Sequence, residues 1–314
     1  MANDVAVPAS ALPLPPSAAE PLSRVWSEAE AFAYCRRLTQ GHYENFPVGS
    51  ALLPASLQPA VHSLYAFMRT ADDFSDEDRR PGDEAERAAW LASWLTLLEA
   101  CEQGKADHPI FIALRRTLAR HRLPVQWLKD LLQAFQMDVT VRRYATWEQL
   151  QTYCRYSANP VGRLILSLFG CREEALYRLS DAICTALQLA NHWQDVAVDL
   201  DKDRIYLPQE DMDRFGYSVG HLQQRVVNKA FEDLMRFEVE RARRLFAAGR
   251  SLPELVRGRL RYELRFTWRG GSRILEKIEA AHYDVFHHRP VLTRADWFRI
   301  GVRSVMADFR WRME

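Results

Sequence analysis

Two acidic clusters carry the side chains in this sequence that could do chemistry. The first lies in the segment YAFMRTADDFSD, where Asp72 and Asp76 are four residues apart and Asp73 lies between them. On a helix, residues four apart share one face, and two like charges there destabilise an isolated helix. Tyr65 and Arg69 fall on the same stripe. Because the repulsion is unfavourable by itself, this pattern favours a role in binding a cation.

The second cluster repeats this spacing in the segment QLANHWQDVAVDLDKDRIYLP. Its polar stripe consists of Gln188, Asn191, Asp195 and Asp199, and Arg204 and Tyr206 follow it. The flanking residues are mostly apolar, so the stripe is expected to face a cavity in which its charges find partners.

Oxygen ligands at this spacing indicate a hard cation. Mg²⁺ binds through one or two carboxylates, waters and substrate phosphates. Two such stripes facing each other would hold several Mg²⁺ ions against a diphosphate. Arg69, Arg204 and Tyr206 would take the remaining oxygens, since guanidinium groups suit phosphate in bidentate geometry. The metal would stabilise charge on a leaving diphosphate. No G-x-S-x-G, H-E-x-x-H, P-loop or G-x-G-x-x-G motif indicates another chemistry.

Helices are expected to position both clusters. The chain has only 13 glycines in 314 residues, and 48% of its residues are hydrophobic, a composition typical of a helical globular protein. Ser27 to Glu30 form a capping box, and Pro124 and Pro160 are expected at helix starts. Helices are predicted at residues 32–38, 57–76, 84–100, 111–121, 124–139, 160–169, 173–200, 219–249, 255–283 and 294–311. We therefore predict an all-α fold, with one domain over residues 23–314 after a flexible tail over residues 1–22.

Charge and cysteine content narrow the class of protein. Five cysteines without a C-x-x-C pair indicate free thiols, and neither a signal peptide nor a stretch of about 20 apolar residues is visible. A cytoplasmic protein is expected.

From Arg236 onward, 17 Arg and one Lys oppose ten acids, a charge of 18 − 10 = +8. This basic third either has solvated helix faces or meets an anionic membrane surface or a diphosphate. No nucleic-acid-binding motif accompanies it.

From about residue 35 to residue 296, the chain resembles the squalene/phytoene synthase family, whose two aspartate-rich motifs match the two clusters. The resemblance implies an all-α isoprenoid synthase fold with a central cavity. It also implies two or three Mg²⁺ ions and ionisation of an allylic or cyclopropylcarbinyl diphosphate. The segments HYENFPVGSALLP, YCRYSANPVG, NHWQDVAVD and ELRFTWRGGSRILEKIEAAHYDV resemble the bacterial hydroxysqualene synthase branch of hopanoid biosynthesis. That branch is expected to convert presqualene diphosphate to hydroxysqualene without NAD(P)H.

The resemblance assigns roles to residues at matching positions. The metal positions are Asp72, Asp73, Asp76, Asn191, Asp195 and Asp199. The supporting diphosphate and pocket positions are Tyr65, Arg69, Gln188, Arg204 and Tyr206, and the loop over the diphosphate supplies His42, Asn45 and Phe46. Tyr153, a catalytic candidate, and Gly162 match a central pocket helix, where the glycine would leave room for an isoprenoid chain.

Two departures from the family pattern suggest how the reaction ends. Gln194 stands where many members have arginine, and Asn159 precedes Pro160 where relatives often have a small residue. We hypothesise that one of these amides positions the water that captures a carbocation. The alternatives are a prenyltransferase that condenses two prenyl diphosphates and, remotely, a non-catalytic assembly factor. Expected partners are the enzyme that makes presqualene diphosphate, the flavin-dependent enzyme that forms squalene, and a membrane surface at the periphery.

Overall fold

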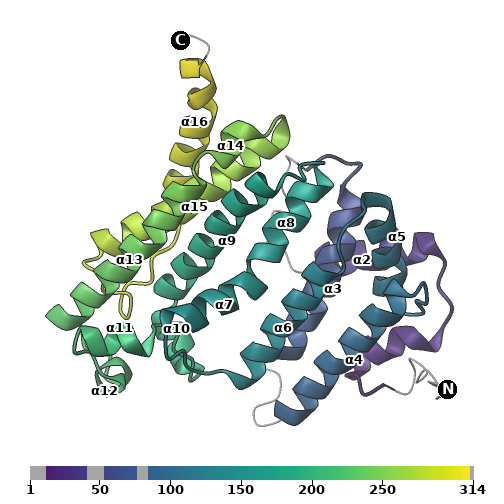
Figure 1. Cartoon of the computed structure of the whole chain (residues 1–314), viewed down its shortest axis with the longest axis horizontal. Helices are drawn as coiled ribbons and strands as arrows, with labels where there is room; N and C mark the ends of the chain where they lie inside the picture. The colour runs from purple at the N-terminus through teal and green to yellow at the C-terminus, as the bar shows by residue number, and fades with distance from the viewer. Residues whose placement is uncertain (1–11, 41–52, 76–83, 312–314) are drawn as a thin grey trace. The chain divides into compact units, whose positions relative to one another are not determined.

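A computed structural model describes residues 12–40, 53–75 and 84–311 (Figure 1). These residues form helices joined by turns, with one isolated bridge between Arg143 and Ile205 in place of any strand. The predicted all-α fold is confirmed. The chain divides into two compact units, Met1–Thr140 and Val141–Glu314, which are described separately below.

In the first unit, α3 is the helix on which most others pack. The elements are α1 (Pro16–Ala19), η2 (Glu20–Ser23), α2 (Glu28–Gln40), α3 (Gln58–Ser75), α4 (Glu84–Glu102), α5 (Pro109–His121) and α6 (Gln126–Thr140). Helices α2, α4, α5 and α6 all contact α3. The core is aromatic: Trp94 lies 4.6 Å from Phe111 and 5.4 Å from Phe74 between ring centroids. This packing fixes the helix that carries the first acidic cluster.

Local side-chain chemistry explains several helix starts in this unit. The predicted capping box is confirmed, because Glu30 Oε2 accepts a hydrogen bond from Ser27 N at 2.9 Å and Ser27 Oγ accepts one from Glu30 N at 3.3 Å. The expected start at Pro124 was wrong, since α6 begins two residues later. His108 caps α5, with Nδ1 accepting from Ile110 N at 3.2 Å.

The predicted flexible tail extended too far along the chain. Residues 16–23 form α1 and η2, and Ala18 and Pro21 are buried. The indole of Trp26 donates to the carbonyl oxygen of Pro21 at 2.7 Å. A proline near each start pre-sets the helical φ angle, and burial of the small apolar residues holds these turns. Residues 1–11 lie outside the described part of the chain.

In the second unit, α9 (Glu174–Gln194) lies at the centre. The other elements are α7 (Trp147–Ser157), α8 (Asn159–Leu168), α10 (Val196–Asp201), α11 (Gln209–Arg214), α12 (Val219–Gln223), α13 (Lys229–Gly249), α14 (Leu252–Leu255), α15 (Arg259–Ala280) and α16 (Arg294–Trp311). Helices α7, α8, α13 and α15 contact α9, and α16 packs on α15 (Figure 1).

Glycines let the neighbouring helices approach α9 closely. A Cβ at Gly249 of α13 would lie 2.4 Å from Ile183, and one at Gly271 of α15 would lie 2.6 Å from Leu187. Both contacts are far shorter than real Cβ atoms make. The absence of these two side chains therefore sets how tightly the helices enclose α9.

Two helices predicted in this unit are interrupted in the structure, and a third helix was not predicted. The continuous helix predicted over residues 173–200 is interrupted at Asp195, whose φ of −107° and ψ of 15° are not helical. The helix predicted over residues 219–249 is divided into α12 and α13, since the Asn228 side chain accepts from Phe231 N at 3.0 Å and begins a new helix. Helix α7, which starts at the Thr146 cap, was missed. Short polar side chains that bond nearby backbone compete with helix continuation.

Candidate functional site: two acidic clusters and their arginines

The second acidic cluster keeps its one-turn spacing across the break between α9 and α10. Asp195 N donates to Asn191 O at 2.9 Å, and Asp199 N donates to Asp195 O at 2.8 Å. The Asn191 amide also donates to Asp195 Oδ2 at 3.2 Å. The predicted polar stripe is therefore present, with Asp195 at the joint between two helices.

Arg289 pairs with Asp195 of this cluster from a distant part of the chain. Its Nε donates to Asp195 Oδ1 at 2.5 Å and its Nη2 donates to Oδ2 at 3.2 Å, across 94 positions of sequence. The Asp195 side chain is only 13% exposed. The hydrogen bond to Asp195, together with the charges of Asp195 and Asp199, raises the pKa of Arg289. The sequence reasoning missed this arginine, since an arginine in a loop before α16 carries no local signal of such a partner.

An aromatic cluster lies beside the same stripe. The rings of His192 and Tyr206 stack with centroids 3.6 Å apart, and Tyr153 lies 6.0 Å from His192 and 5.8 Å from Tyr206. Tyr144 stacks on Tyr206 at 5.7 Å. The predicted pocket residues Tyr153 and Tyr206 are therefore brought together, and Tyr144 and His192 join them without having been predicted.

His192 is an uncharged member of that cluster. Burial, and secondarily the positive charge of Arg204, lowers the pKa of His192 to about 3. Gln188 Nε2 lies 3.4 Å from His192 Nε2. His192, Asp199, Arg204 and Tyr206 line one small pocket, which is completed by Val196, Ile205, Leu207 and Leu222. The lining of this pocket thus combines charged and polar residues with apolar ones.

The two residues proposed to position water lie on α8 and α9. Asn159 begins α8, and its Oδ1 accepts from Thr185 Oγ1 of α9 at 3.0 Å. Gln194 is the last residue of α9, directly before Asp195, and is half-buried. Gln194 thus adjoins the second cluster in the chain, Asn159 is bonded to the helix that carries it, and the role of both amides in positioning water remains a prediction.

Gly162 lies where α8 packs against α9, and its expected role of leaving room for a substrate chain stays a prediction. A Cβ at Gly162 would lie 2.3 Å from Ser180 Oγ and 2.6 Å from Cys184 Sγ. The space beside the glycine is therefore filled by side chains of α9. Gly162 allows α8 to lie close against α9.

The first acidic cluster lies on α3 in the other unit. Arg69 Nη2 lies 2.7 Å from Asp73 Oδ1, and Nη1 lies 3.3 Å from Asp72 Oδ2. Burial raises the pKa of Tyr65, and the positive charge of Arg69 opposes this shift. The structure thus brings together four of the residues predicted here. Four further predicted residues lie outside the described part of the chain: Asp76, His42, Asn45 and Phe46.

The donor sets of both clusters fit Mg²⁺. Each offers carboxylate oxygens, and the second adds the amide of Asn191. Within the described ranges, no three His, Cys, Asp or Glu side chains gather into a metal cage. Mg²⁺ commonly takes one or two carboxylates and completes its shell with waters and substrate phosphates. The residues present therefore suit a metal that arrives with a diphosphate.

This helical architecture is that of the all-α isoprenoid synthases. The crystal structure of squalene synthase HpnC from Alicyclobacillus acidocaldarius is similar, with a TM-score of 0.77 and 42% identity, covering 82% of this chain and 95% of that one. The family model for squalene/phytoene synthase matches residues 39–296. The chain belongs to the squalene/phytoene synthase family.

Two curated relatives represent different activities within this family. The hydroxysqualene synthase of Rhodopseudomonas palustris is 35% identical over 75% of this chain and 80% of that protein. The 15-cis-phytoene synthase of Synechococcus elongatus is 31% identical over 86% of this chain and 91% of that protein. Membership therefore indicates an isoprenoid-synthesising enzyme and leaves the particular reaction to be proposed.

Proposed function

We propose that this chain is a hydroxysqualene synthase, a carbon–oxygen lyase that converts presqualene diphosphate to hydroxysqualene and diphosphate in hopanoid biosynthesis. The observation that carries the proposal is the stripe of Asn191, Asp195 and Asp199 beside an aromatic cluster. Curated hydroxysqualene synthases that are 35% and 40% identical to this chain support the specific activity.

The polar residues would hold the diphosphate end of the substrate. Two or three Mg²⁺ ions would be held by Asp72, Asp73, Asp76, Asn191, Asp195 and Asp199. When bound, the metal supplies Lewis-acid stabilisation of the leaving diphosphate. Arg69 and Arg204 would bind diphosphate oxygens as charged donors, with Tyr65, Gln188 and Tyr206 beside them. His42, Asn45 and Phe46 are proposed to cover this group.

The aromatic residues would protect and stabilise the positive charge that forms when the diphosphate leaves. Faces of Tyr153 and Tyr206 attract a cation through the ring quadrupole. Because His192 stays neutral at physiological pH, it adds no repulsive charge to this cluster. An apolar surround also keeps stray water from the carbocation.

The final step needs one positioned water. The bond from carbon to the diphosphate oxygen breaks with its electron pair on the leaving group. The cyclopropylcarbinyl cation would then rearrange by opening of the cyclopropane ring. A water oxygen forms the new carbon–oxygen bond to the rearranged cation and loses a proton to the released diphosphate or to solvent. We propose that Asn159 or Gln194 positions this water. Such an ending requires no hydride donor, so no NAD(P)H is expected.

A condensing synthase that joins two prenyl diphosphates is the second candidate. The phytoene synthase of Synechococcus elongatus matches a larger share of this chain than the hydroxysqualene synthase of Rhodopseudomonas palustris does. A non-catalytic assembly factor remains a distant third, since such a protein has no need of aspartates in both clusters.

A product assay by mass spectrometry distinguishes these functions. Purified protein with Mg²⁺ and no nicotinamide receives presqualene diphosphate in one reaction and farnesyl diphosphate in another. Hydroxysqualene from the first and no product from the second is expected. Consumption of farnesyl diphosphate would instead identify a condensing synthase, and inertness toward both would favour the assembly factor.

A matched pair of variants makes that assay specific for the second cluster. Asp195→Asn keeps the shape of the side chain and removes its charge, so product formation should fall by at least about 100-fold. Asp201→Asn at the end of α10 is the control, because its side chain is 65% exposed and pairs only with Arg225 among the described residues. Circular dichroism and melting temperature must show that both variants are folded.

A further inference from the structure

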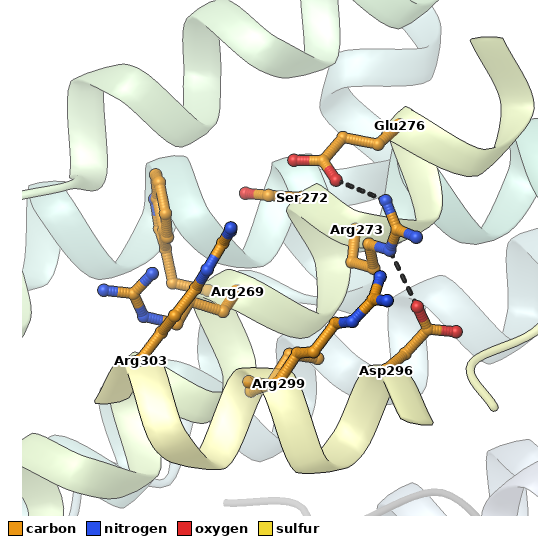
Figure 2. A pocket seen from close by; sticks show the side chains of 9 residues that line it. Arg269, Ser272, Arg273, Glu276, Asp296, Arg299 and Arg303 are labelled. Atoms are coloured by element: carbon orange, nitrogen blue, oxygen red, sulfur yellow. Dashed lines mark hydrogen bonds and ion pairs between the residues drawn. The ribbon is translucent and has the colours of Figure 1, made fainter. Parts of the chain in front are cut away.

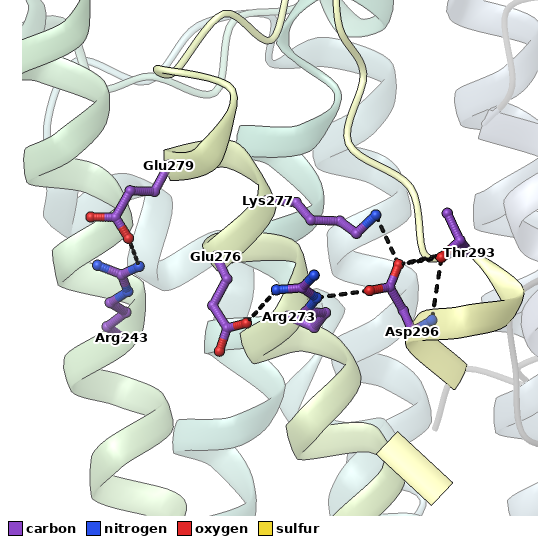
Figure 3. Close-up of polar contacts among 7 residues, drawn as sticks. All are labelled: Arg243, Arg273, Glu276, Lys277, Glu279, Thr293 and Asp296. Atoms are coloured by element: carbon purple, nitrogen blue, oxygen red, sulfur yellow. Dashed lines mark hydrogen bonds and ion pairs between the residues drawn. The ribbon is translucent and has the colours of Figure 1, made fainter. Parts of the chain in front are cut away.

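The C-terminal helix α16 is held firmly at its start by a buried carboxylate. Asp296 is 4% exposed and lies 2.8 Å from both Arg273 Nε and Lys277 Nζ of α15. Its Oδ2 also accepts from Thr293 N and Oγ1 at 2.9 and 2.7 Å (Figure 3). Ile300 and Ser304 continue the buried side of the helix. The opposite side of α16 therefore has a fixed orientation within this unit.

A pocket rich in arginine lies between α15 and α16, next to this anchor (Figure 2). Its lining residues are Trp268, Arg269, Ser272, Arg273, Glu276, Asp296, Arg299, Ile300 and Arg303. Both carboxylates of the lining already bond Arg273. Among the residues that the structure describes, Arg269, Arg299 and Arg303 form no ion pair. The pocket thus carries positive charge that the described side chains leave uncompensated.

Two buried polar atoms in the same pocket have no hydrogen-bond partner among the described residues. They are Arg269 Nε and Ser272 Oγ, and both can donate. Burial, together with the nearby positive charges of Arg303 and Arg265, lowers the pKa of Arg269. A group with several acceptor oxygens and negative charge would satisfy these donors and relieve the repulsion. A phosphate has this chemistry.

Exposed apolar residues flank the pocket on the outward side of α16. Phe298 is 74% exposed and Val302 is 40% exposed. In sequence they alternate with the buried residues Asp296, Ile300 and Ser304, so on the helix they face the opposite way. Each directly precedes an arginine, Arg299 or Arg303. Arginines beside outward-facing apolar side chains are typical of helices that lie in a membrane interface. No helix in the described part of the chain has the length and hydropathy to span a membrane.

We propose that α16 and the arginine pocket dock this protein on an anionic lipid surface. A lipid phosphate would occupy the pocket formed by Arg269, Arg299 and Arg303, and Phe298 and Val302 would enter the interfacial layer. A free phosphate compound would not account for the exposed Phe298. A second copy of the chain would bring the same arginines into a symmetric contact and repel them. This proposal does not depend on which reaction the enzyme performs.

Vesicle flotation with the full chain tests the proposal. One set of vesicles contains phosphatidylglycerol and phosphatidylcholine, and the other contains phosphatidylcholine alone. We expect binding to the anionic vesicles at low salt, weakened by added salt because exposed charges are screened. The double variant Arg299→Ala/Arg303→Ala should weaken binding about 30-fold, since each arginine near an anionic surface contributes about fivefold. Phe298→Ser/Val302→Ser should weaken it at least about fivefold.

Matched controls show whether vesicle binding depends on this surface or on positive charge and hydrophobicity anywhere on the protein. Arg120→Ala/Arg244→Ala removes two exposed arginines of α5 and α13, and Leu255→Ser alters an apolar side chain that is 57% exposed. Both should bind vesicles as the unaltered chain does. Melting temperatures must confirm that all variants are folded.

Several results would overturn the docking surface. They are absence of binding to either vesicle, equal binding to both, and equal loss of binding in the pocket variants and the arginine controls. Binding of inorganic diphosphate that depends on Arg299 and Arg303, without vesicle binding, would identify a site for a soluble anion. A dimer in light scattering that Phe298→Ser dissociates, again without vesicle binding, would identify a contact between two copies.

Discussion

Gly162→Ala tests whether the space beside this glycine serves packing or substrate. A Cβ there would lie 2.3 Å from Ser180 Oγ and 2.6 Å from Cys184 Sγ, whereas ordinary contacts are 3.4–4 Å. Helix α8 must therefore move about 1 Å away from α9, or both side chains must rearrange. Overpacking of this kind costs about 3 kcal/mol at the upper end. Alanine regains about 1 kcal/mol of helix propensity, so the expected net loss of unfolding free energy is about 2 kcal/mol.

Urea unfolding followed by circular dichroism measures this loss. The control is Gly220→Ala in α12, where the nearest atom to a new Cβ is Ser218 Oγ at an ordinary 3.6 Å. That variant should be unchanged or more stable by up to about 1 kcal/mol. In the Gly162→Ala background, Ser180→Ala/Cys184→Ala should recover part of the lost stability, since both clashing atoms are removed.

One pair of results would refute the packing argument. If Gly162→Ala unfolds at the same urea concentration as the unaltered chain and instead raises the KM for presqualene diphosphate, the position serves the substrate chain. The expectation drawn from the sequence would then be right. A loss of stability with an unchanged KM supports the packing role.

Three further substitutions test the ionisable side chains of Arg289, His108 and Glu238. Arg289→Ala should strengthen binding of Mg²⁺ alone about fivefold in calorimetry, because the Asp195 carboxylate loses its resident cation; unchanged affinity would show that this ion pair does not compete. Burial lowers the pKa of His108 to about 3, so the folded state binds fewer protons than the unfolded state and stability should fall by about 2 kcal/mol from pH 7 to pH 5. His108→Asn, which can still cap α5, should lose this slope in urea titrations. Burial raises the pKa of Glu238 to about 8 despite Arg241, so the folded state binds more protons than the unfolded state. Stability should therefore fall as the pH rises from about 4.5 to 8. Glu238→Gln should remove that fall, and an equal slope in both proteins would contradict the assignment.

The helical fold and much of the second cluster follow from local pattern. Apolar spacing and capping residues predicted the all-α class and the helix at α2, because both signals lie within one or two turns of chain. The spacing of Asn191, Asp195 and Asp199 survived even where the predicted helix breaks, since backbone bonds four residues apart continue through Asp195. A pattern with a four-residue period needs only this bonding and tolerates a change of helix axis.

Long-range contacts explain what the sequence could not predict. The partner of Asp195 lies 94 positions away in a loop, and the ring stacked on Tyr206 is that of His192 in the last turn of α9. The role of Gly162 depends on which side chains of α9 fill the adjacent space. None of these facts has a periodic signature. They arise only when helices that are distant in sequence pack against one another.

The arginines resolve a difficulty that the sequence raised. Acids one turn apart repel one another, and from sequence alone a bound cation was the obvious compensation. In the structure, Arg69 lies against Asp72 and Asp73, and Arg289 binds Asp195 with two hydrogen bonds. Each cluster thus has a compensating cation within its own unit. Because folding can proceed with these arginines in place, metal binding need not contribute to folding as it does in small zinc domains. Under the proposed function, each arginine would leave its carboxylates when the metal arrives with the substrate.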